Sequence, residues 1–555
     1  MTSHEPDYDP DKDSTKSPSS PREQLPTSAF AHHDPEKALS SPRTDITVLT
    51  WDSPTDPENP YNWSNTRKWV VTAAALTGTL LGPLNGTSIA IAAQALTNEF
   101  SISDTATFSN SYWPIASWSV GGSLFIIVFL PLMEDIGVRA GYLIFYALFI
   151  LMIIPQALAP NFAALVITRF ISGGCVALLA NTIASVIPDV WATDEARSVP
   201  VGLYIMLYLV GSTLGPPMFA GVMQHIGNWR WIFYIQLIIY GCFFPFFWFL
   251  LRETRGDVIL RRRAQKLRKQ TGKPVYTKAE LEAPPLVPRL LRSMSRPAYL
   301  LFTEPVLFAS TCWSAFSFGT VFLFTQSIEA VFSGLYGWEE YSVGYVQGAV
   351  VIGELIGWLI TLYSSHLYLK SASRNTEMPG KPIPEARLYV STAASFIGIV
   401  GGMFVYAWTS YPYFPWIAPA IGLAMVGCGI QVVVSAVADY ITDAYAASDY
   451  AGSAIGAVAA GENTVAGLLP LAAASMYTNL GKCSHCLSSS DWLLIIISGF
   501  QWASTLLAFI ALVLSFAPVL FIFKGRTFRE RSPFMLSGGQ ITRGQKAAQE
   551  AQTER

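Results

Sequence analysis

Three ionisable side chains lie inside long apolar stretches of this 555-residue sequence: Arg169, Glu354 and Glu462. A charge at the centre of a bilayer costs about 2.5–3.5 kcal/mol on insertion scales, so such a residue is a functional candidate by default. Asn463, beside Glu462, and Asn85, in the first apolar stretch, are polar residues in a similar setting. We interpret these five as candidates for substrate binding or ion coupling, although each could instead brace neighbouring helices.

Carboxylates, rather than histidines, are the candidates for carrying protons. A carboxylate becomes neutral when it is protonated, so it can alternate between a charged and an uncharged state inside the membrane. The six histidines all fall in the predicted tails or loops and are not expected to relay protons through the membrane interior: His4, His32, His33, His225, His366 and His485.

Aromatic side chains are concentrated in the apolar stretch near residues 303–325, where Trp313 and Phe316 are our candidates for a ligand cavity. Rings that face a cavity suit a lipophilic or planar ligand. The alternative is that these rings face lipid or pack between helices.

A CxxC motif, formed by Cys483 and Cys486, is the one pattern with metal-ligand character among the six cysteines. A closed zinc site needs a second pair of ligands, which the sequence does not offer nearby. We therefore expect a local disulfide or two free thiols here, and no metal site.

The composition indicates a membrane solvent. Apolar residues make up 51% of the chain and charged residues 13%, against about 25% charged in soluble domains. Stretches near the ~20 residues needed to cross a bilayer recur from Trp69 onward. We place twelve spans near residues 69–93, 112–133, 141–159, 162–187, 199–223, 229–251, 303–325, 341–363, 387–408, 415–438, 452–477 and 491–523.

The spans divide six and six around a long polar segment, and this division predicts the domain organisation. Residues 1–68 are expected to be a disordered tail, because their apolar content is too low to offset the entropy of ordering. The expected order is then a six-helix bundle at 69–251, a basic linker at 252–300, a second six-helix bundle at 301–524 and a carboxyl-terminal tail at 525–555.

The distribution of Lys and Arg predicts the orientation. Cytoplasmic loops retain positive charge, and residues 252–300 hold thirteen Lys and Arg, whereas Arg230 and Lys482 are the only ones in the loops on the opposite side. Both termini are therefore expected to be cytoplasmic, in a multi-pass protein that we assign to the plasma membrane.

Common catalytic and nucleotide-binding motifs are missing. The sequence contains no HExxH, no GxxxxGK[ST] and no GxSxG. We therefore expect neither an enzyme nor an ATP-driven pump, and no cofactor. The charge pattern does not indicate nucleic acid; the expected partners are a small-molecule substrate, protons and the lipid bilayer.

Two glycine-containing patterns are candidates for conformational motifs. The segment between the second and third spans carries Glu134, Gly137 and Arg139. The fifth span carries Gly211, Gly215 and Pro216, where small residues four apart allow close helix approach and the proline bends the helix.

Four segments that flank the spans carry a family resemblance: residues 56–69, 253–268, 384–388 and 440–445. Together with the patterns above, they make the sequence resemble the fungal branch of the major facilitator superfamily, within the twelve-span drug:proton antiporters. The resemblance covers nearly the whole chain beyond the first fifty residues.

The resemblance also implies roles for the motifs. In the family, the loop that carries Glu134, Gly137 and Arg139 helps to latch one conformation, and the span 4 arginine of R-x-x-x-G, here Arg169 with Gly173, is linked to proton coupling. The antiporter pattern of span 5 has paired glycines where this sequence has Phe219 and Ala220. Many relatives place an arginine at the position of Glu462, which suggests a distinct substrate or coupling chemistry here.

The fold implied is an all-α polytopic membrane protein with the major facilitator fold, in which two six-helix bundles of about twelve helices rock around a central site. We expect a functional monomer that exports small lipophilic organic molecules, such as drugs, toxins or secondary metabolites, by proton antiport. Two alternatives remain: a facilitator or proton symporter for an organic solute, and a non-transporting membrane receptor with the same fold.

Overall fold

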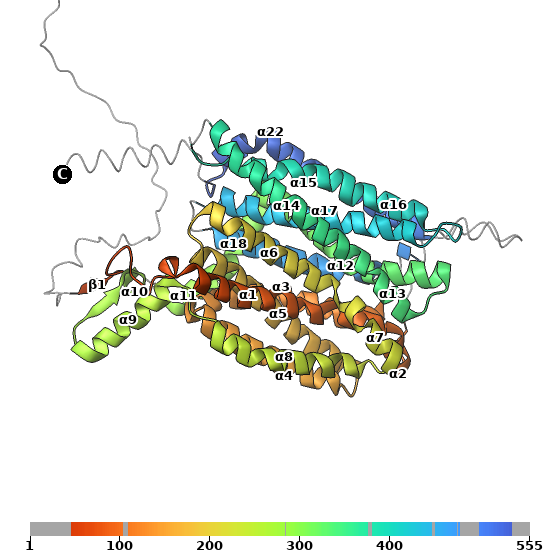
Figure 1. Ribbon diagram of the computed structural model, residues 1–555, viewed down its shortest axis with the longest axis horizontal. Helices are drawn as coiled ribbons and strands as arrows, with labels where there is room; N and C mark the ends of the chain where they lie inside the picture. Colours follow the sequence, from red (N-terminus) through yellow and green to blue (C-terminus); the bar gives the residue numbers. More distant parts are fainter. Residues whose placement is uncertain are drawn as a thin grey trace, which may run out of the picture.

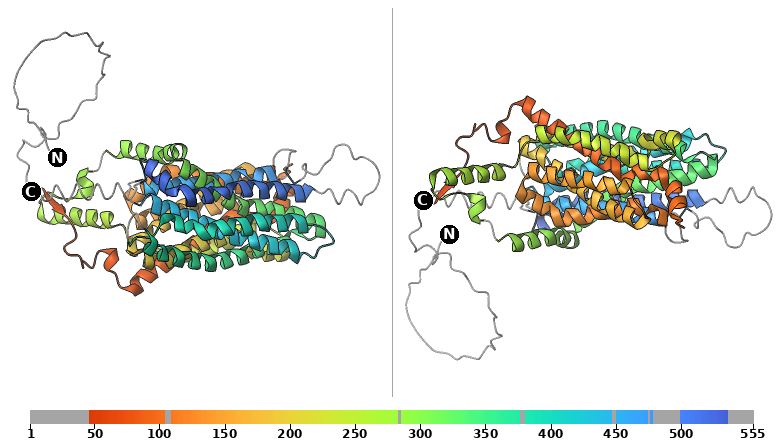
Figure 2. Two further views of the ribbon diagram at one scale, coloured as in Figure 1. Left: turned by 90° about the horizontal axis from the view of Figure 1, so that it is seen from above. Right: turned by 90° about the horizontal axis from the view of Figure 1, so that it is seen from below.

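The protein is an elongated bundle of helices that run along its long axis, as a computed structural model shows (Figures 1 and 2). The structure describes residues 46–103, 109–282, 285–375, 380–446, 450–473, 476–477 and 499–535. Cys483 and Cys486 lie outside these residues, and so do residues 1–45 of the expected tail.

The helices of the first half pack together on one side of the molecule (Figure 1). They are α1 (Asn65–Thr87), α2 (Ala93–Phe100), α3 (Trp113–Ile136), α4 (Val138–Ala157), α5 (Phe162–Val190), α6 (Asp194–Thr213), α7 (Gly215–Ile226) and α8 (Arg230–Leu250). A 3₁₀ helix, η3 (Ser88–Ala92), joins α1 to α2.

The helices of the second half form the other side (Figure 1). They are α12 (Pro305–Tyr336), α13 (Glu340–Val346), α14 (Gly348–Lys370), α15 (Leu388–Ala394), α16 (Gly402–Thr409), α17 (Ile417–Ala444), α18 (Ala451–Leu468), α21 (Gly499–Leu514) and α22 (Phe516–Arg531). A π-helical segment, Ser395–Gly401, connects α15 to α16.

Eleven helical stretches among the described residues are long and apolar enough to cross a bilayer. We count α1 as the twelfth span, because its 23 residues also suffice. Glycine and threonine lower the apolarity of α1, but Thr72, Thr79, Asn85 and Thr87 are buried.

The fifth span is broken between α6 and α7, next to Pro216 and Pro217. A proline lacks the N–H that would continue the helical hydrogen bonding, so the break is what these residues predict. Gly215 lies at the break, where an added Cβ would come within 2.6 Å of the Ser88 backbone nitrogen. The break therefore lets α7 lie close to η3.

The linker consists of α9 (Gly256–Thr271), β2 (Val275–Thr277), α10 (Lys278–Glu282) and α11 (Leu286–Thr303). It lies at one end of the bundles, which we call the linker end (Figure 2). The opposite end, near α2, α7 and α13, we call the distal end (Figure 1).

The structure corrects the expectation of disorder for residues 46–68. Strand β1 (Thr47–Leu49) pairs in parallel with β2, and Asp56 is buried. Arg263 of α9 forms ion pairs with Asp52 and, at 2.9 Å, with Asp56. The segment is held by these polar contacts together with the buried side chain of Trp63, and an argument from its low overall apolar content missed both.

Two histidines expected in loops lie in helices instead. His225 is in the last turn of α7 and His366 is in the last two turns of α14, and both side chains are exposed. Neither is buried between the bundles, so carboxylates remain the candidates for proton transfer.

Candidate functional site

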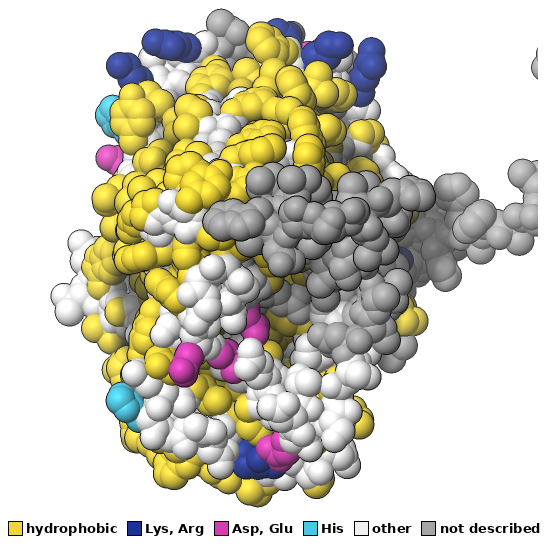
Figure 3. All heavy atoms as spheres, turned by 90° about the vertical axis from the view of Figure 1, so that its right-hand side faces the viewer, with side chains coloured by type: hydrophobic (Ala, Val, Ile, Leu, Met, Phe, Trp, Pro, Cys, Tyr) yellow, Lys and Arg dark blue, Asp and Glu magenta, His cyan; other side chains and the backbone are white. Residues whose placement is uncertain are grey.

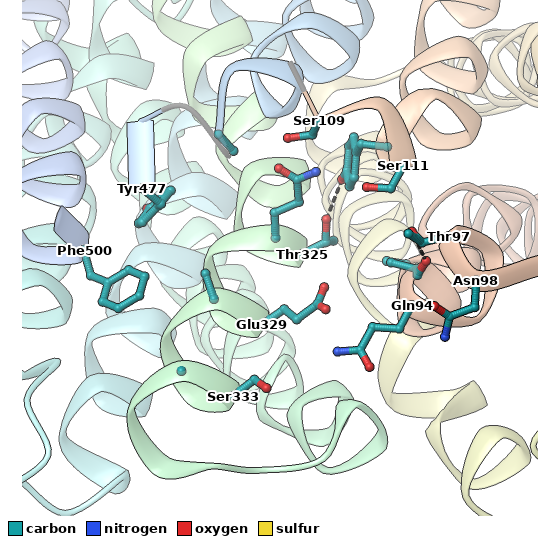
Figure 4. Close-up of a pocket in the computed structure, with 17 residues that line it drawn as sticks. Gln94, Thr97, Asn98, Ser109, Ser111, Thr325, Glu329, Ser333, Tyr477 and Phe500 are labelled. Atoms are coloured by element: carbon teal, nitrogen blue, oxygen red, sulfur yellow. Dashed lines mark hydrogen bonds between the residues drawn. The ribbon is translucent and has the colours of Figure 1, made fainter. Parts of the chain in front are cut away.

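A cavity of about 580 Å³ opens at the distal end between the two halves of the chain. Glu329 of α12 projects into it, with Gln94 and Asn98 of α2 on one side and Tyr477 and Phe500 on the other (Figure 4). Its size is that of a site for a drug-sized molecule. We call it the distal cavity.

A second cavity, of about 220 Å³, lies toward the linker end. Tyr204 and Tyr208 of α6 line it from one half of the chain, and Glu462 and Asn463 of α18 line it from the other. Most of the remaining lining is aliphatic. We call it the linker-end cavity.

An aromatic layer separates the two cavities. Tyr208, which lines the linker-end cavity, stacks on Phe318 with ring centroids 5.7 Å apart. Phe318 contacts Phe322 at 5.4 Å, and the Phe322 carbonyl accepts a 2.8 Å hydrogen bond from Tyr112, which lines the distal cavity. Trp118 also stacks on Phe322. A molecule that passed from one cavity to the other would have to displace these rings.

Glu462 lies where α18 faces the linker-end cavity, and it is only partly buried. Its Oε1 accepts a 2.5 Å hydrogen bond from the Ser314 hydroxyl of α12. Asn463 is almost fully buried and donates to the Ala459 carbonyl, while its Oδ1 has no hydrogen-bond partner among the described residues. The carboxylate is therefore held on one side and open to the cavity on the other.

Glu354 joins the two halves of the chain. It is fully buried in α14, and its Oε1 accepts a 2.7 Å hydrogen bond from Thr213, the last residue of α6. Its Oε2 is buried and finds no hydrogen-bond partner within the described part of the chain. A buried carboxylate with one unpaired oxygen is costly unless it is protonated, so this contact depends on the charge of Glu354.

Arg169 and Asn85 form a buried network inside the first half of the chain. Arg169 donates to the Pro114 carbonyl at 2.9 Å, to the Asn85 carbonyl at 2.8 Å and to the Gly86 carbonyl. The last two carbonyls belong to the final turn of α1, the negative end of its helix dipole. The Asn85 side chain accepts from Trp118 and donates to Gln236. This arrangement fixes Trp118, a member of the aromatic layer.

Gly173 allows α5 to lie directly against α3. A Cβ at Gly173 would be 2.0 Å from the Trp118 carbonyl oxygen, and one at Gly121 would be 2.0 Å from that of Phe170. Gly211 allows a close approach of α6 to α1, because a Cβ there would be 2.5 Å from the Leu80 carbonyl oxygen. These glycines set the position of the helices that carry the network.

Trp313 and Phe316 are buried within the second half of the chain, and neither lines the two cavities. The Trp313 indole N–H donates to Ser395 of the π-helical segment. Of the aromatic residues on α12, Phe318 and Phe322 take part in the layer between the cavities instead. Residue type alone could not distinguish these positions, because α12 is buried on nearly every side.

The loop after α3 contacts the start of the linker. Gly137 has a φ of 101°, and the Val138 N–H donates to Glu253 at 3.0 Å. Arg139 donates to the Trp248 carbonyl at the end of α8. Glu134 lies in the last turns of α3, and its side chain is outside what the structure describes.

Sequence reasoning missed two groups of charged residues. Glu329 was overlooked because the seventh span was placed at 303–325, whereas α12 continues to Tyr336. Near the linker end, Arg387 pairs with Asp439 at 2.9 Å and with Asp443 at 3.1 Å. The sequence did offer a sign of the contact between Arg387 and Asp443, because these residues belong to two of the segments that carry the family resemblance.

Comparison with known proteins agrees with this architecture. Residues 75–470 match the family model described as Major Facilitator Superfamily. The chain is 30% identical over 483 residues to the MFS-type transporter paaT of Penicillium rubens, which covers 87% of this chain and 83% of the relative. It is 28% identical to the efflux pump radE of Floropilus chiversii, over 92% of this chain and 89% of the relative.

A further relative is the cycloheximide resistance protein of Candida maltosa, 27% identical over 89% of this chain and 87% of the relative. Among solved structures, the proton:xylose symporter XylE is similar with a TM-score of 0.55 at 15% identity, over 83% of this chain and 96% of that one. A bacterial homologue of the human lysosomal transporter Spinster has a TM-score of 0.53 at 14% identity, over 85% and 100%. At this identity, the structural likeness concerns the fold alone.

The two groups of helices enclose cavities on both sides of an aromatic layer, and the family model matches most of the chain. This chain is therefore a multi-pass membrane transporter that belongs to the Major Facilitator Superfamily.

Proposed function

We propose that the protein exports small lipophilic organic molecules by proton antiport and acts as a monomer. The observation that carries the proposal is the pair of cavities separated by the aromatic layer of Trp118, Tyr208, Phe318 and Phe322. Closing one cavity while the other opens would give alternating access across that layer. One relative is named as an efflux pump and another as a cycloheximide resistance protein, which favours export.

The linker end is proposed to face the cytoplasm, at the plasma membrane. Thirteen Lys and Arg lie in residues 252–300, and cytoplasmic segments retain positive charge. Both termini would then be cytoplasmic, because an even number of spans separates them. Substrate would enter the linker-end cavity and leave through the distal cavity.

We assign the coupling roles to two carboxylates inside the membrane-spanning helices, Glu462 and Glu354. Glu462 borders the linker-end cavity, so a proton and a substrate could compete for it, as antiport requires. Glu354 would respond to protonation differently, because its carboxyl holds α14 to α6 through Thr213. Arg169 would act by fixing the helices around Asn85 and Trp118, because its N–H groups are used by carbonyl oxygens.

An accumulation assay across a compound panel tests the direction of transport and the substrate class together. The full chain is expressed in cells that lack their own efflux pumps, and intracellular compound is measured with and without the protein. Export predicts lower accumulation of a subset of lipophilic compounds, and collapse of the proton gradient should restore it.

Higher accumulation that is stimulated by external acid would overturn the proposal in favour of a proton symporter. Higher accumulation without pH dependence would indicate a facilitator. If no compound changed while the protein was abundant at the cell surface, a receptor would be the better interpretation.

A further inference from the structure

Among the described residues that line the distal cavity, the charged side chains are of one sign. Glu329 projects into it, and Glu340, at the start of α13, lines the narrow space that continues from it. The backbone N–H of Gln94 donates to Glu340 at 3.2 Å. Among the described residues that line the cavity there is no lysine or arginine. On the distal face, acidic side chains gather beside a hollow near the middle (Figure 3).

The other walls of the distal cavity suit a ligand that is apolar around its charge. Tyr477 and Phe500 lie with ring centroids 6.3 Å apart on the side opposite Gln94 and Asn98 (Figure 4). Aromatic rings attract cations through their faces as well as burying apolar groups. Carboxylate, aromatic rings and amides around about 580 Å³ therefore fit a drug-sized organic cation.

The linker-end cavity repeats this chemistry independently. Its central carboxylate is Glu462, next to Tyr204 and Tyr208. Two cations, Arg197 and Arg387, also line it, but the carboxylates Asp439, Asp443 and Glu462 outnumber them, and Arg387 is paired with Asp439 and Asp443. The buried cation Arg169 lines neither cavity and donates to carbonyl oxygens. A route with a carboxylate and aromatic rings on both sides of the layer favours positive over negative substrates.

We propose that the transported molecules are lipophilic organic cations, such as protonated amines, and that Glu329 in the distal cavity is a second binding position for them, beyond Glu462. This proposal names the substrate class of the proposed exporter, and it rests on the proposed function for the direction in which the cation is transported. The binding step does not depend on it, because a carboxylate attracts a cation in either direction of transport.

Binding of two size-matched ions tests the charge selectivity. The purified full chain in lipid nanodiscs is titrated with tetraphenylphosphonium and with tetraphenylborate, which have nearly the same shape and opposite charge. The proposal predicts saturable binding of the phosphonium ion and at least about tenfold weaker binding of the borate ion. Equal affinity for the two ions, or no saturable binding of the phosphonium ion, would overturn it.

Three variants locate the site. Glu329→Gln should weaken phosphonium binding about tenfold, whereas Glu329→Asp, which keeps the charge, should lose no more than about threefold. Glu339→Gln is the matched control, because the Glu339 side chain is exposed, makes no capping hydrogen bond to α13 and lines neither the distal cavity nor its continuation. Elution as a single species and an unchanged melting temperature show that each variant is folded.

The remaining outcomes also decide the inference. If Glu329→Gln bound the phosphonium ion like the parent, Glu329 would not be a cation-binding residue. If it impaired efflux of neutral and cationic compounds equally while phosphonium binding was kept, Glu329 would be a proton site instead. Failure of the proposed export would appear separately, as cation binding without any change in cellular accumulation.

Discussion

Replacement of Gly173 by alanine should separate α3 from α5 and destabilise the protein. The added Cβ would lie 2.0 Å from the Trp118 carbonyl oxygen, whereas real Cβ contacts essentially never fall below 3.0 Å, so the helices must move apart by at least the difference of 1.0 Å. Helix association in a membrane depends on close packing rather than on a hydrophobic driving force. Overpacking of this kind costs about 1–3 kcal/mol.

That cost converts to a measurable shift. The entropy of unfolding of a 555-residue chain makes the shift about 1 °C per kcal/mol, so the melting temperature of Gly173→Ala should fall by about 1–3 °C. The full chain in detergent is heated to a series of temperatures, and the folded protein that remains is measured by size-exclusion chromatography. Transport should fall further than stability alone explains, because Trp118 belongs to the aromatic layer and Arg169 lies one turn from Gly173 on α5.

A matched control separates packing from helix propensity. Gly241 of α8 is exposed, and a Cβ there would meet nothing within 4 Å. Gly241→Ala should leave the melting temperature unchanged or raise it slightly, because alanine is the better helix former by about 0.5–1 kcal/mol. If both variants behaved alike, the close approach of α3 and α5 would not be a determinant of stability.

Three further predictions concern the amino-terminal segment, which contacts α9, and Glu354, which joins the two halves of the chain. Arg263→Gln should release residues 46–58 from α9 and make them several-fold more sensitive to added protease, with no loss of helix content by circular dichroism. Hydrogen bonds from the Glu58 backbone N–H and from Arg263 hold the pKa of Asp56 below its usual 3.8. The protease resistance of the parent should therefore be the same at about pH 7 and pH 5. It should decline only as the pH falls through the lowered pKa of Asp56. Glu354→Gln can still accept from Thr213 but does not titrate, so the protein should keep substrate binding while the pH dependence of its transport flattens; an unchanged pH profile would remove Glu354 from the coupling scheme.

Hydropathy predicted the membrane-spanning architecture because the length of an apolar helix is set by bilayer thickness. The eleven apolar stretches found by the structure correspond to predicted spans, and the remaining span, α1, is glycine- and threonine-rich. The ends of spans were harder to predict. The seventh continues past the predicted residue 325, and this extension carries Glu329 into the distal cavity.

The sequence could not predict which residues of the two halves of the chain meet each other. The cost of burial identified Glu354 and Glu462 as unusual, but only the packing of helices shows that Glu354 meets Thr213 across the two halves and that Glu462 borders a cavity. Trp313 and Phe318 are both aromatic residues of one buried helix, so nothing local distinguishes a residue inside one half of the chain from one between the halves.

The most direct test of proton-coupled export is a comparison of the parent chain with Glu462→Gln in proteoliposomes. A compound exported in the accumulation assay is followed in two modes: accumulation driven by an imposed pH gradient, and exchange of labelled for unlabelled compound without a gradient. Glutamine keeps the size of the side chain and can accept from Ser314, so folding should be preserved. The account predicts that gradient-driven accumulation falls to background while exchange persists, and that Glu339→Gln behaves like the parent in both modes. Parental accumulation by Glu462→Gln, with the parental pH dependence, would contradict the central role of this carboxylate.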